Sequence, residues 1–271
     1  MRAAFTATNN ELFDASRREA LAGAKIIVWP EQGGLTFDRD EAKLLASGQT
    51  LAREEHIYLE MAYEVFQPVP SQNKAVLIDP QGRVVWTYEK AHPAPGADPS
   101  TPGDGIIPVA NTPYGRLANV ICLDAFYPGL MQQVGEKGID VMLVPGLEWP
   151  GITDWVPQVT AFRAIEYGYS LVRPATNDIS LTVDYEGRTL AATDYFTTDQ
   201  QVMIASVPTK GVWMIYGLVG DLFSWLCIGG LFVLTGLVVV RSWRKPSSTR
   251  SADLQAEPLP LEEPLASAGA R

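Results

Sequence analysis

The sequence predicts an α/β fold, built either on one mixed sheet or on two sheets packed face to face with helices outside. Two observations carry this prediction. Helix–strand units alternate with hairpins along the first 208 residues, and many of the strands are short and apolar enough to be buried. The chain has 271 residues, of which 46% are hydrophobic and 19% charged, so it can form a sizeable core in one large domain or two small ones.

In the first half, helices are expected where apolar residues recur near helical spacing, and strands where short runs are apolar or β-branched. The expected helices are residues 10–22 and 40–54, and the expected strands are residues 24–29 and 57–66. Two apolar runs in residues 74–90 flank Asp79-Pro80-Gln81-Gly82, a turn signal, and predict a hairpin. Residues 91–105 are too rich in Pro and Gly for regular structure.

The second half continues this mixture. Two apolar runs around Thr112-Pro113-Tyr114-Gly115 predict a second hairpin at residues 106–122. Helices are expected at residues 130–138 and 155–168, each ended by a glycine. The remaining expected strands are residues 141–145, 170–176, 179–196 with a turn at Glu186-Gly187, and 201–207.

The C-terminal part differs in composition. Residues 222–240 read LFSWLCIGGLFVLTGLVVV without one charge, which is about enough to cross ~30 Å of hydrocarbon as a helix. A buried core helix is the alternative, although core helices of this length usually carry a polar stripe. The following RSWRK supplies Arg241, Arg244 and Lys245, whose positive charge marks a cytoplasmic side. The sequence therefore predicts a single-pass protein of the cell membrane, with the globular part extracytoplasmic and the C-terminus cytoplasmic.

Four regions follow from this interpretation. We expect a globular domain at residues 1–210, an interfacial segment at 211–221, a transmembrane helix at 222–241 and a disordered cytoplasmic tail at 242–271. The tail is rich in Pro, Ser, Ala and Glu, a composition typical of disorder. The N-terminus has no apolar core long enough for a signal peptide.

Composition and motifs exclude several function classes. The formal net charge is −10 and the globular part has no basic stripe, so nucleic acid is not an expected partner. Two cysteines make no disulfide framework, and the two histidines, His56 and His92, are far apart, so no zinc site is indicated. The chain has no Gly-rich phosphate loop, and we expect no metal and no cofactor.

Three polar residues share one placement. Glu31 follows the apolar run AKIIVWP, Lys90 follows RVVWTYE and Cys122 follows RLANVI. Sites in α/β proteins form where strands end at one edge of a sheet, so these side chains could meet there. Taken singly, each has a plainer interpretation: Cys122 as a small core residue, Glu31 as a helix N-terminal or surface charge, and Lys90 as a solvated charge.

Together these groups would make a catalytic set. A carboxylate can take the thiol proton, and the thiolate can attack a carbonyl or nitrile carbon. The Lys ammonium and a backbone N–H just after the cysteine can stabilise the oxyanion. The carboxylic acid so formed can protonate the departing amine.

The chain resembles the nitrilase, or carbon–nitrogen hydrolase, superfamily. Four blocks match in the family's order: IIVWPE, YEKAHPAPG, PGDGIIPVANTPYGRLANVICLDAFYP and FRAIEYGYSLVRPATNDISLTVDYEGR. The resemblance covers about residues 10–208 and implies a four-layer αββα sandwich. It also implies a triad of Glu31 as general base and acid, Lys90 as oxyanion partner and Cys122 as nucleophile, with the N–H of Leu123 as second oxyanion donor.

A narrower resemblance lies at the C-terminus. GVWMIYGLVGDLFSW followed by a spanning helix is similar to the end of apolipoprotein N-acyltransferases, which carry an extracytoplasmic nitrilase-like domain between membrane helices. IIVWPE, the block that ends at Glu31, is also similar to the corresponding block of these acyltransferases. This resemblance implies membrane lipid as a partner, and possible partnership with a separate polytopic membrane subunit.

The match departs from the family at three places. The family's opening strand is missing or replaced by residues 1–10, which leaves open a fragment, a mis-started reading frame or one half of a split protein. The loop after Lys90 offers Asp98 or Asp104 where the family has another Glu. Asp124, two residues after Cys122, is typical of the superfamily, whereas the acyltransferases usually have Glu there.

The sequence leaves three candidate functions open, two of them catalytic and one not. The first is a membrane-anchored hydrolase that acts on an amide or ester carbonyl, with water resolving a Cys122 thioester. The second is transfer of an acyl group from phospholipid to a lipoprotein amine. The third is a catalytically impaired pseudoenzyme or fragment. The expected substrate is a small amide or an acyl lipid, and Trp149 is either a wall of its pocket or a core residue.

Overall fold

The computed structural model describes residues 1–149, 151–152, 155–199 and 201–244. The chain divides into two units, Met1–Asp221 and Leu222–Arg271. The first unit holds every strand of the described residues, and the second consists of the helix α6 (Leu222–Arg244) as far as it is described.

The first unit contains two main sheets. In one, the strand order is β1 (Ile26–Val28), β3 (Tyr58–Val65), β4 (Gln72–Ile78) and β5 (Val84–Glu89), and β2 (Gly34–Thr36) also pairs with β3. In the other, the order is β13 (Thr189–Asp194), β12 (Ile179–Val183), β10 (Ser170–Arg173), β8 (Val141–Leu143), β7 (Gly115–Asn119) and β6 (Val109–Thr112). β9 (Gly146–Leu147) and β11 (Ala175–Thr176) form a short parallel pair.

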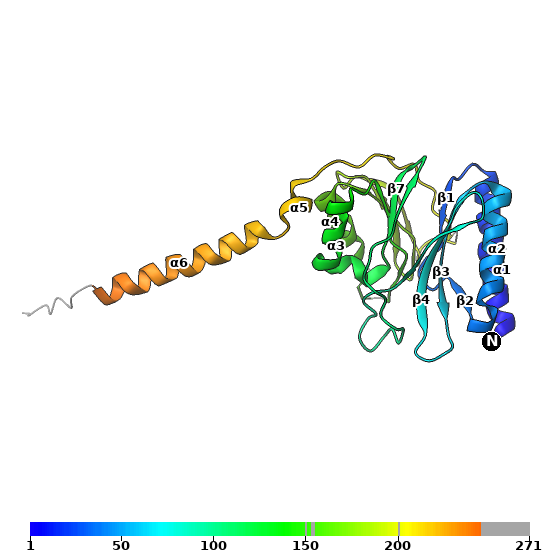
Figure 1. The fold of residues 1–271 in the computed structure, drawn as a ribbon, viewed down its shortest axis with the longest axis horizontal. Helices are drawn as coiled ribbons and strands as arrows, with labels where there is room; N and C mark the ends of the chain where they lie inside the picture. Colours follow the sequence, from blue (N-terminus) through cyan, green and yellow to red (C-terminus); the bar gives the residue numbers. More distant parts are fainter. Residues whose placement is uncertain (150, 153–154, 200, 245–271) are drawn as a thin grey trace, which may run out of the picture. The chain divides into compact units, whose positions relative to one another are not determined.

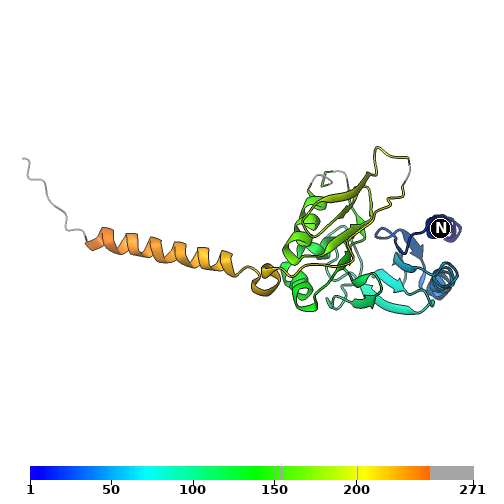
Figure 2. The same cartoon turned by 90° about the horizontal axis from the view of Figure 1, so that it is seen from above.

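Helices cover the outer faces of both sheets, so the four-layer αββα prediction is confirmed. Figures 1 and 2 show α1 (Arg2–Leu21) and α2 (Asp38–Glu55) on one side, and α3 (Pro128–Lys137) and α4 (Val156–Tyr167) on the other. Three apolar clusters fill the three interfaces between layers. The middle cluster joins side chains of the two sheets, among them Leu77, Trp86, Leu117 and Leu143.

Most elements agree with the expectations from sequence. Both hairpins form, and the strand expected at residues 57–66 is β3 (Tyr58–Val65). Helices α3 and α4 end at Gly138 and Gly168 in the left-handed conformation that favours glycine. The first helix begins earlier than expected, because residues 2–9 are also helical.

Two expectations about strands were wrong, and two short strands were not expected. Residues 201–207 form no strand in the structure, although they are apolar. Residues 170–176 are split into β10 and β11, because Pro174 has no N–H to continue a ladder. β2 and β9 were not expected, because each has only two or three residues and too little pattern to be recognised.

The segment 211–221 contains a short helix, α5 (Ile215–Val219), which packs on the outer helices of the first unit. The Tyr216 ring meets the Tyr167 ring edge to face at 5.4 Å between centroids. Gly135 of α3 lies so close to the Gly217 backbone that a side chain at Gly135 would clash. An interfacial role for this segment remains a prediction.

α6 is long and apolar enough to cross a membrane over residues 222–243. The predicted span, 222–241, lies inside it. The helix continues through residue 244, so the expectation of disorder from residue 242 is wrong for residues 242–244. Residues 245–271, with the basic Lys245 and the rest of the expected tail, lie outside the described residues.

Candidate active site

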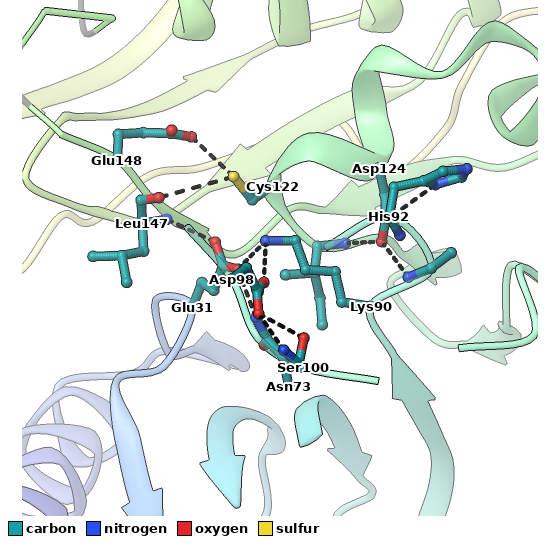
Figure 3. Close-up of polar contacts among 12 residues, drawn as sticks. Glu31, Asn73, Lys90, His92, Asp98, Ser100, Cys122, Asp124, Leu147 and Glu148 are labelled. Atoms are coloured by element: carbon teal, nitrogen blue, oxygen red, sulfur yellow. Dashed lines mark hydrogen bonds and ion pairs between the residues drawn. The ribbon is translucent and has the colours of Figure 1, made fainter. Parts of the chain in front are cut away.

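The structure brings Glu31, Lys90 and Cys122 together between the two sheets. Glu31 follows β1, Lys90 follows β5, and Cys122 begins the short 3₁₀ helix η1 (Cys122–Phe126) just after β7. Figure 3 shows the three side chains gathered at one place. All three are buried, so the solvated-charge interpretations of Glu31 and Lys90 do not hold.

Three donors hold the Glu31 carboxylate. Its Oε1 accepts hydrogen bonds from Lys90 Nζ at 2.6 Å and from Asn73 Nδ2 at 2.7 Å. Its Oε2 accepts from the Leu147 N–H at 2.9 Å. Upstream, the buried Trp29 donates its indole N–H to Ser16 Oγ at 2.9 Å, which ties the turn containing Glu31 to α1.

Lys90 is a buried cation between two carboxylates. Its Nζ lies 2.6 Å from Glu31 Oε1 and 2.9 Å from Asp98 Oδ2. Burial alone would lower the pKa of Lys90, but the two carboxylates outweigh it and hold this pKa above its usual value. Lys90 therefore stays charged over the whole physiological pH range.

Of the two acids in the loop, the structure places Asp98 and not Asp104 beside Lys90. Asp98 Oδ1 accepts hydrogen bonds from the N–H and hydroxyl of Ser100, at 3.0 Å and 2.6 Å. Burial disfavours the carboxylate, but Ser100 and Lys90 together hold the pKa of Asp98 below its usual value. Asp104 instead accepts from the Ile106 N–H at 2.9 Å.

Cys122 combines a strained backbone with a buried thiol. Its φ is +45°, a region that non-glycine residues rarely adopt and that costs on the order of 1 kcal/mol or more. The backbone N–H donates to the Pro145 carbonyl at 2.8 Å, which joins this turn to the end of β8. Burial raises the pKa of the Cys122 thiol, and the carboxylates of Glu31 and Glu148 add to this against the opposing effect of Lys90.

The two residues after the cysteine have different environments. Leu123 lies in the first turn of η1, where backbone N–H groups have no acceptor within the helix. Asp124 is fully buried and accepts hydrogen bonds from the Tyr88 hydroxyl at 2.7 Å and the His92 N–H at 2.7 Å. Asp124 thereby ties the loop after Lys90 to the turn that carries Cys122.

Glu148 was not predicted as a site residue. Its Oε1 lies 3.1 Å from Cys122 Sγ and 3.1 Å from Nη2 of the buried Arg173 (Figure 3 draws the sulfur contact). Arg173 also pairs with Asp178 at 2.6 Å. Burial raises the pKa of Glu148. The signal in the sequence was the same one that pointed to Glu31, an acid a few residues past the buried run VMLVP.

Trp149 follows Glu148 directly. Its side chain is 52% exposed, so Trp149 does not lie in the core. A role as a wall of the substrate pocket remains a prediction.

The arrangement suits nucleophilic chemistry at a carbonyl carbon. A buried thiol lies among carboxylates that can take its proton and a fixed ammonium that can stabilise negative charge. These groups are held by hydrogen bonds from several elements, so little reorganisation is needed when charge develops.

Comparison with known proteins gives both family and fold. Residues 4–212 match the carbon–nitrogen hydrolase family. An apolipoprotein N-acyltransferase of Geobacter metallireducens is 25% identical over 254 residues, which cover 83% of this chain and 48% of that protein. A formamidase of Allorhizobium ampelinum is 28% identical over 141 residues, which cover 48% of this chain and 41% of that protein. The chain thus spans about half or less of the length of these relatives.

Solved structures share the fold. An amidase from Nesterenkonia sp. has a TM-score of 0.64 at 19% identity, covering 76% of this chain and 86% of that chain. A carbon–nitrogen hydrolase from Helicobacter pylori G27 has a TM-score of 0.64 at 16% identity, covering 74% of this chain and 85% of that chain.

Proposed function

Because the chain belongs to the carbon–nitrogen hydrolase family, we propose that it is a thiol enzyme whose Cys122 attacks an amide or ester carbonyl and holds the acyl group as a thioester. The observation that carries this proposal is the buried ion pair of Lys90 and Glu31, 2.6 Å apart, beside the strained turn of Cys122. A turn held under strain next to an ion pair is typical of a catalytic site.

The roles follow from the geometry and the family. Glu31 serves as general base and later as general acid, since it is the carboxylate paired with Lys90. Lys90 stays charged and, with the Leu123 N–H, stabilises the oxyanion formed when the thiolate attacks. Asp98 supports Lys90 from the loop where the family has a Glu. This contact answers one of the two departures that favour the pseudoenzyme alternative, the missing Glu, and leaves the other, the missing opening strand.

Water resolves the thioester in the function that we favour, which is hydrolysis. Asp124 supports this choice, because it is typical of the superfamily at the position where the acyltransferases usually have Glu. Trp149, half exposed next to Glu148, is the side chain that we expect to contact the substrate.

Acyl transfer is the second candidate, and one observation favours it. The match to the Geobacter acyltransferase extends over 83% of this chain, further than the match to the formamidase. In this function a lipid supplies the acyl group, and a lipoprotein amine resolves the thioester.

We also propose that α6 anchors the enzyme in the cell membrane as a single span. Its length and composition fit a bilayer, and the basic residues from Arg241 onward would place the C-terminus in the cytoplasm and the active site outside it. Under the acyltransferase function, we propose a separate polytopic membrane subunit as the partner.

Product analysis separates the two functions. The full chain in detergent micelles is offered short aliphatic amides, and separately a phospholipid together with an amine-bearing lipopeptide. Release of ammonia and free acid supports the hydrolase, whereas an N-acylated lipopeptide supports the transferase. The Cys122→Ala variant must abolish either product, and activity that survives this change would refute both.

A further inference from the structure

Asn73 is a neutral side chain that joins two carboxylates of the site. Its Nδ2 donates to Glu31 Oε1 at 2.7 Å and, over a longer 3.3 Å, to Asp98 Oδ2 (Figure 3). An amide nitrogen carries two hydrogens, so these two bonds use both of its donors. The orientation of this amide therefore decides whether Glu31 meets a donor or an acceptor.

The oxygen of the same amide is buried without a donor. Asn73 Oδ1 accepts no hydrogen bond from any of the described residues. Two further buried atoms share this condition, Oε2 of Glu64 on β3 and the hydroxyl oxygen of Ser71, which precedes β4. Leaving a buried polar atom without a partner is unfavourable, and folded proteins rarely do so. An arrangement of hydrogens that pairs these three atoms with one another is therefore favoured.

The pairing of β3 with β4 places Glu64 beside Asn73. The two residues are direct partners across this antiparallel ladder, so their side chains lie on the same face, with Cβ atoms about 4.5–5.5 Å apart. The Ser71 hydroxyl is close enough to act on the Glu64 carboxyl. On the other side of Glu64, β2 contributes the apolar Leu35, which offers no side-chain hydrogen bond. Glu64 is 2% exposed and Asn73 is fully buried, so bulk solvent does not pair their oxygens.

A proton on Glu64 completes the pairing. Neutral Glu64 has one O–H donor and one carbonyl oxygen. The O–H can donate to Asn73 Oδ1, and the Ser71 hydroxyl can donate to the carbonyl oxygen of Glu64. An ionised Glu64 has acceptors only, so it repels Asn73 Oδ1 and attracts the amide NH₂ instead. Turning the amide in this way presents its oxygen to Glu31 and Asp98, which are acceptors as well.

The surroundings of Glu64 favour the neutral acid. The charged groups that act on it are Asp98 from the loop after β5, Glu31 after β1 and Lys90 after β5. Burial is the largest cause and raises the pKa of Glu64 to about 7. The two carboxylates act in the same direction, whereas Lys90 and the Ser71 hydroxyl oppose them. Glu64 therefore exchanges its proton close to neutral pH.

We propose that Glu64 is a positioning residue: its proton fixes the amide of Asn73, and this amide in turn holds the carboxylate of Glu31 for catalysis. The proton stays on Glu64 throughout the reaction. Glu31 remains the base that takes the proton of Cys122 and the acid that protonates the leaving group. Loss of the Glu64 proton turns the amide, withdraws a donor from Glu31 and slows the attack. This inference rests on the proposed function and adds a pH-sensitive support to its general base.

The test is the pH profile of the first acylation of Cys122 by p-nitrophenyl acetate in the full chain, read by mass mapping of the acetylated peptide. Glu64→Gln keeps a donor for Asn73 Oδ1 at every pH, because its amide NH₂ does not titrate. The ratio of the Glu64→Gln rate to the native rate cancels the titration of Cys122 itself. This ratio should be constant at acidic pH and rise as pH increases through about 7, approaching about tenfold per pH unit, the slope of one titrating group. A merely structural role for Glu64 would change the rates without making their ratio depend on pH.

Further variants test the path from Glu64 to the site. Asn73→Ala removes the amide, so adding Glu64→Gln to it should no longer change the pH profile, because the two residues act as one unit. Ser71→Ala removes the hydroxyl that favours ionised Glu64, so the loss of rate should move to higher pH. This second variant also serves if Glu64→Gln does not fold. Glu136→Gln, an exposed change on α3, is the control and should follow the native profile.

The possible outcomes separate this inference from the proposed function. A constant ratio from acidic to alkaline pH, the same rise in the Asn73→Ala background, or an unmoved profile in Ser71→Ala overturns the role of Glu64 and leaves the proposed function standing. Alkylation of Cys122 by chloroacetamide tests the proposed function by itself. If Cys122 of the native chain reacts no faster than a free thiol at every pH, the proposed function fails, and the role of Glu64 fails with it.

Discussion

The ammonium nitrogen of Lys90 lies 2.6 Å from Oε1 of Glu31, with side chains only 3% and 2% exposed. The two residues follow β5 and β1, which are separated in their sheet by β4 and β3. β1 and β5 run in the same direction, because β1 is parallel to β3 and two antiparallel pairs follow. Both strands therefore end at the same edge of the sheet, and the ion pair of Lys90 and Glu31 forms there.

Breaking this pair should destabilise the fold. Lys90→Met leaves the Glu31 carboxylate buried without its cation, which typically costs about 3–5 kcal/mol. Urea denaturation of the full chain in detergent measures the change. The matched control is Arg17→Met, which breaks an exposed pair with Glu54 and should change stability by less than about 1 kcal/mol. Equal losses of unfolding free energy in the two variants would show that the buried pair stabilises the fold no more than the exposed pair does.

Asp124 should act by positioning the nucleophile. Asp124→Asn replaces one acceptor oxygen by an amide nitrogen, which then faces a donor: the Tyr88 hydroxyl if it stands at Oδ2, or the His92 N–H if it stands at Oδ1. The two loops should then shift, and alkylation of Cys122 should slow by about 10- to 100-fold, because small misplacements of reacting groups cost that much. Tyr88→Phe removes a single donor and should have the smaller effect. An unchanged rate in Asp124→Asn argues against positioning.

Glu64 should make stability depend on pH. Burial raises the pKa of Glu64 to about 7 from 4.5, and nearby Asp98 and Glu31 act in the same direction. The folded state thus binds the proton more tightly than the unfolded state, so this group's contribution to stability is greatest below pH 4.5 and is lost as pH rises to about 7.

Glu64→Gln removes this dependence. The variant should gain stability relative to the native chain as pH rises through that window, by at most about 1.4 kcal/mol per pH unit, with no further gain above it. Thermal unfolding at several pH values measures the difference between the two proteins. If the difference in stability between the variant and the native chain stays constant from acidic to alkaline pH, the raised pKa assigned to Glu64 is contradicted.

A charge at the centre of α6 should prevent this helix from anchoring the chain in a membrane. Leu231→Arg places a cation in the middle of the span and costs about 2.5–3.5 kcal/mol of insertion. Ser242→Arg, at the end of the helix, is the control and should be tolerated. Alkaline extraction of membranes that contain each variant shows which chains stay bound. Full retention of the Leu231 variant would mean that α6 is not the anchor.

Local patterns predicted the α/β class and placed three candidate side chains at strand ends, but they left one mixed sheet or two packed sheets open; the four-layer arrangement came from the resemblance to the family. Glu31, Lys90 and Cys122 each end a recognisable apolar run, and apolar periodicity marked both hairpins and the helices that end at Gly138 and Gly168. The apolar run at residues 201–207 led to a wrong prediction of a strand, because such a run can pack against the fold without pairing with another strand.

Long-range contacts could not be predicted. The choice of Asp98 over Asp104 depends on how the loop folds back onto Lys90, and no periodicity encodes that path. Glu148 was missed because its position depends on Arg173, 25 residues away in the chain. The sequence does place Glu148 shortly after the buried run VMLVP, as Glu31 follows its own apolar run, but its contact with Cys122 arises only in the folded chain.

The central claim is that Cys122 carries the acyl group, and mass analysis of the trapped enzyme tests it most directly. The full chain is mixed with an activated acyl ester, quenched in acid and digested, and the acylated peptide is identified. We predict an acyl group on Cys122, discharged by hydroxylamine, with turnover slowed about 100-fold or more in Glu31→Gln. Acylation absent from Cys122, or equal in the native chain and in Cys122→Ala, contradicts the account.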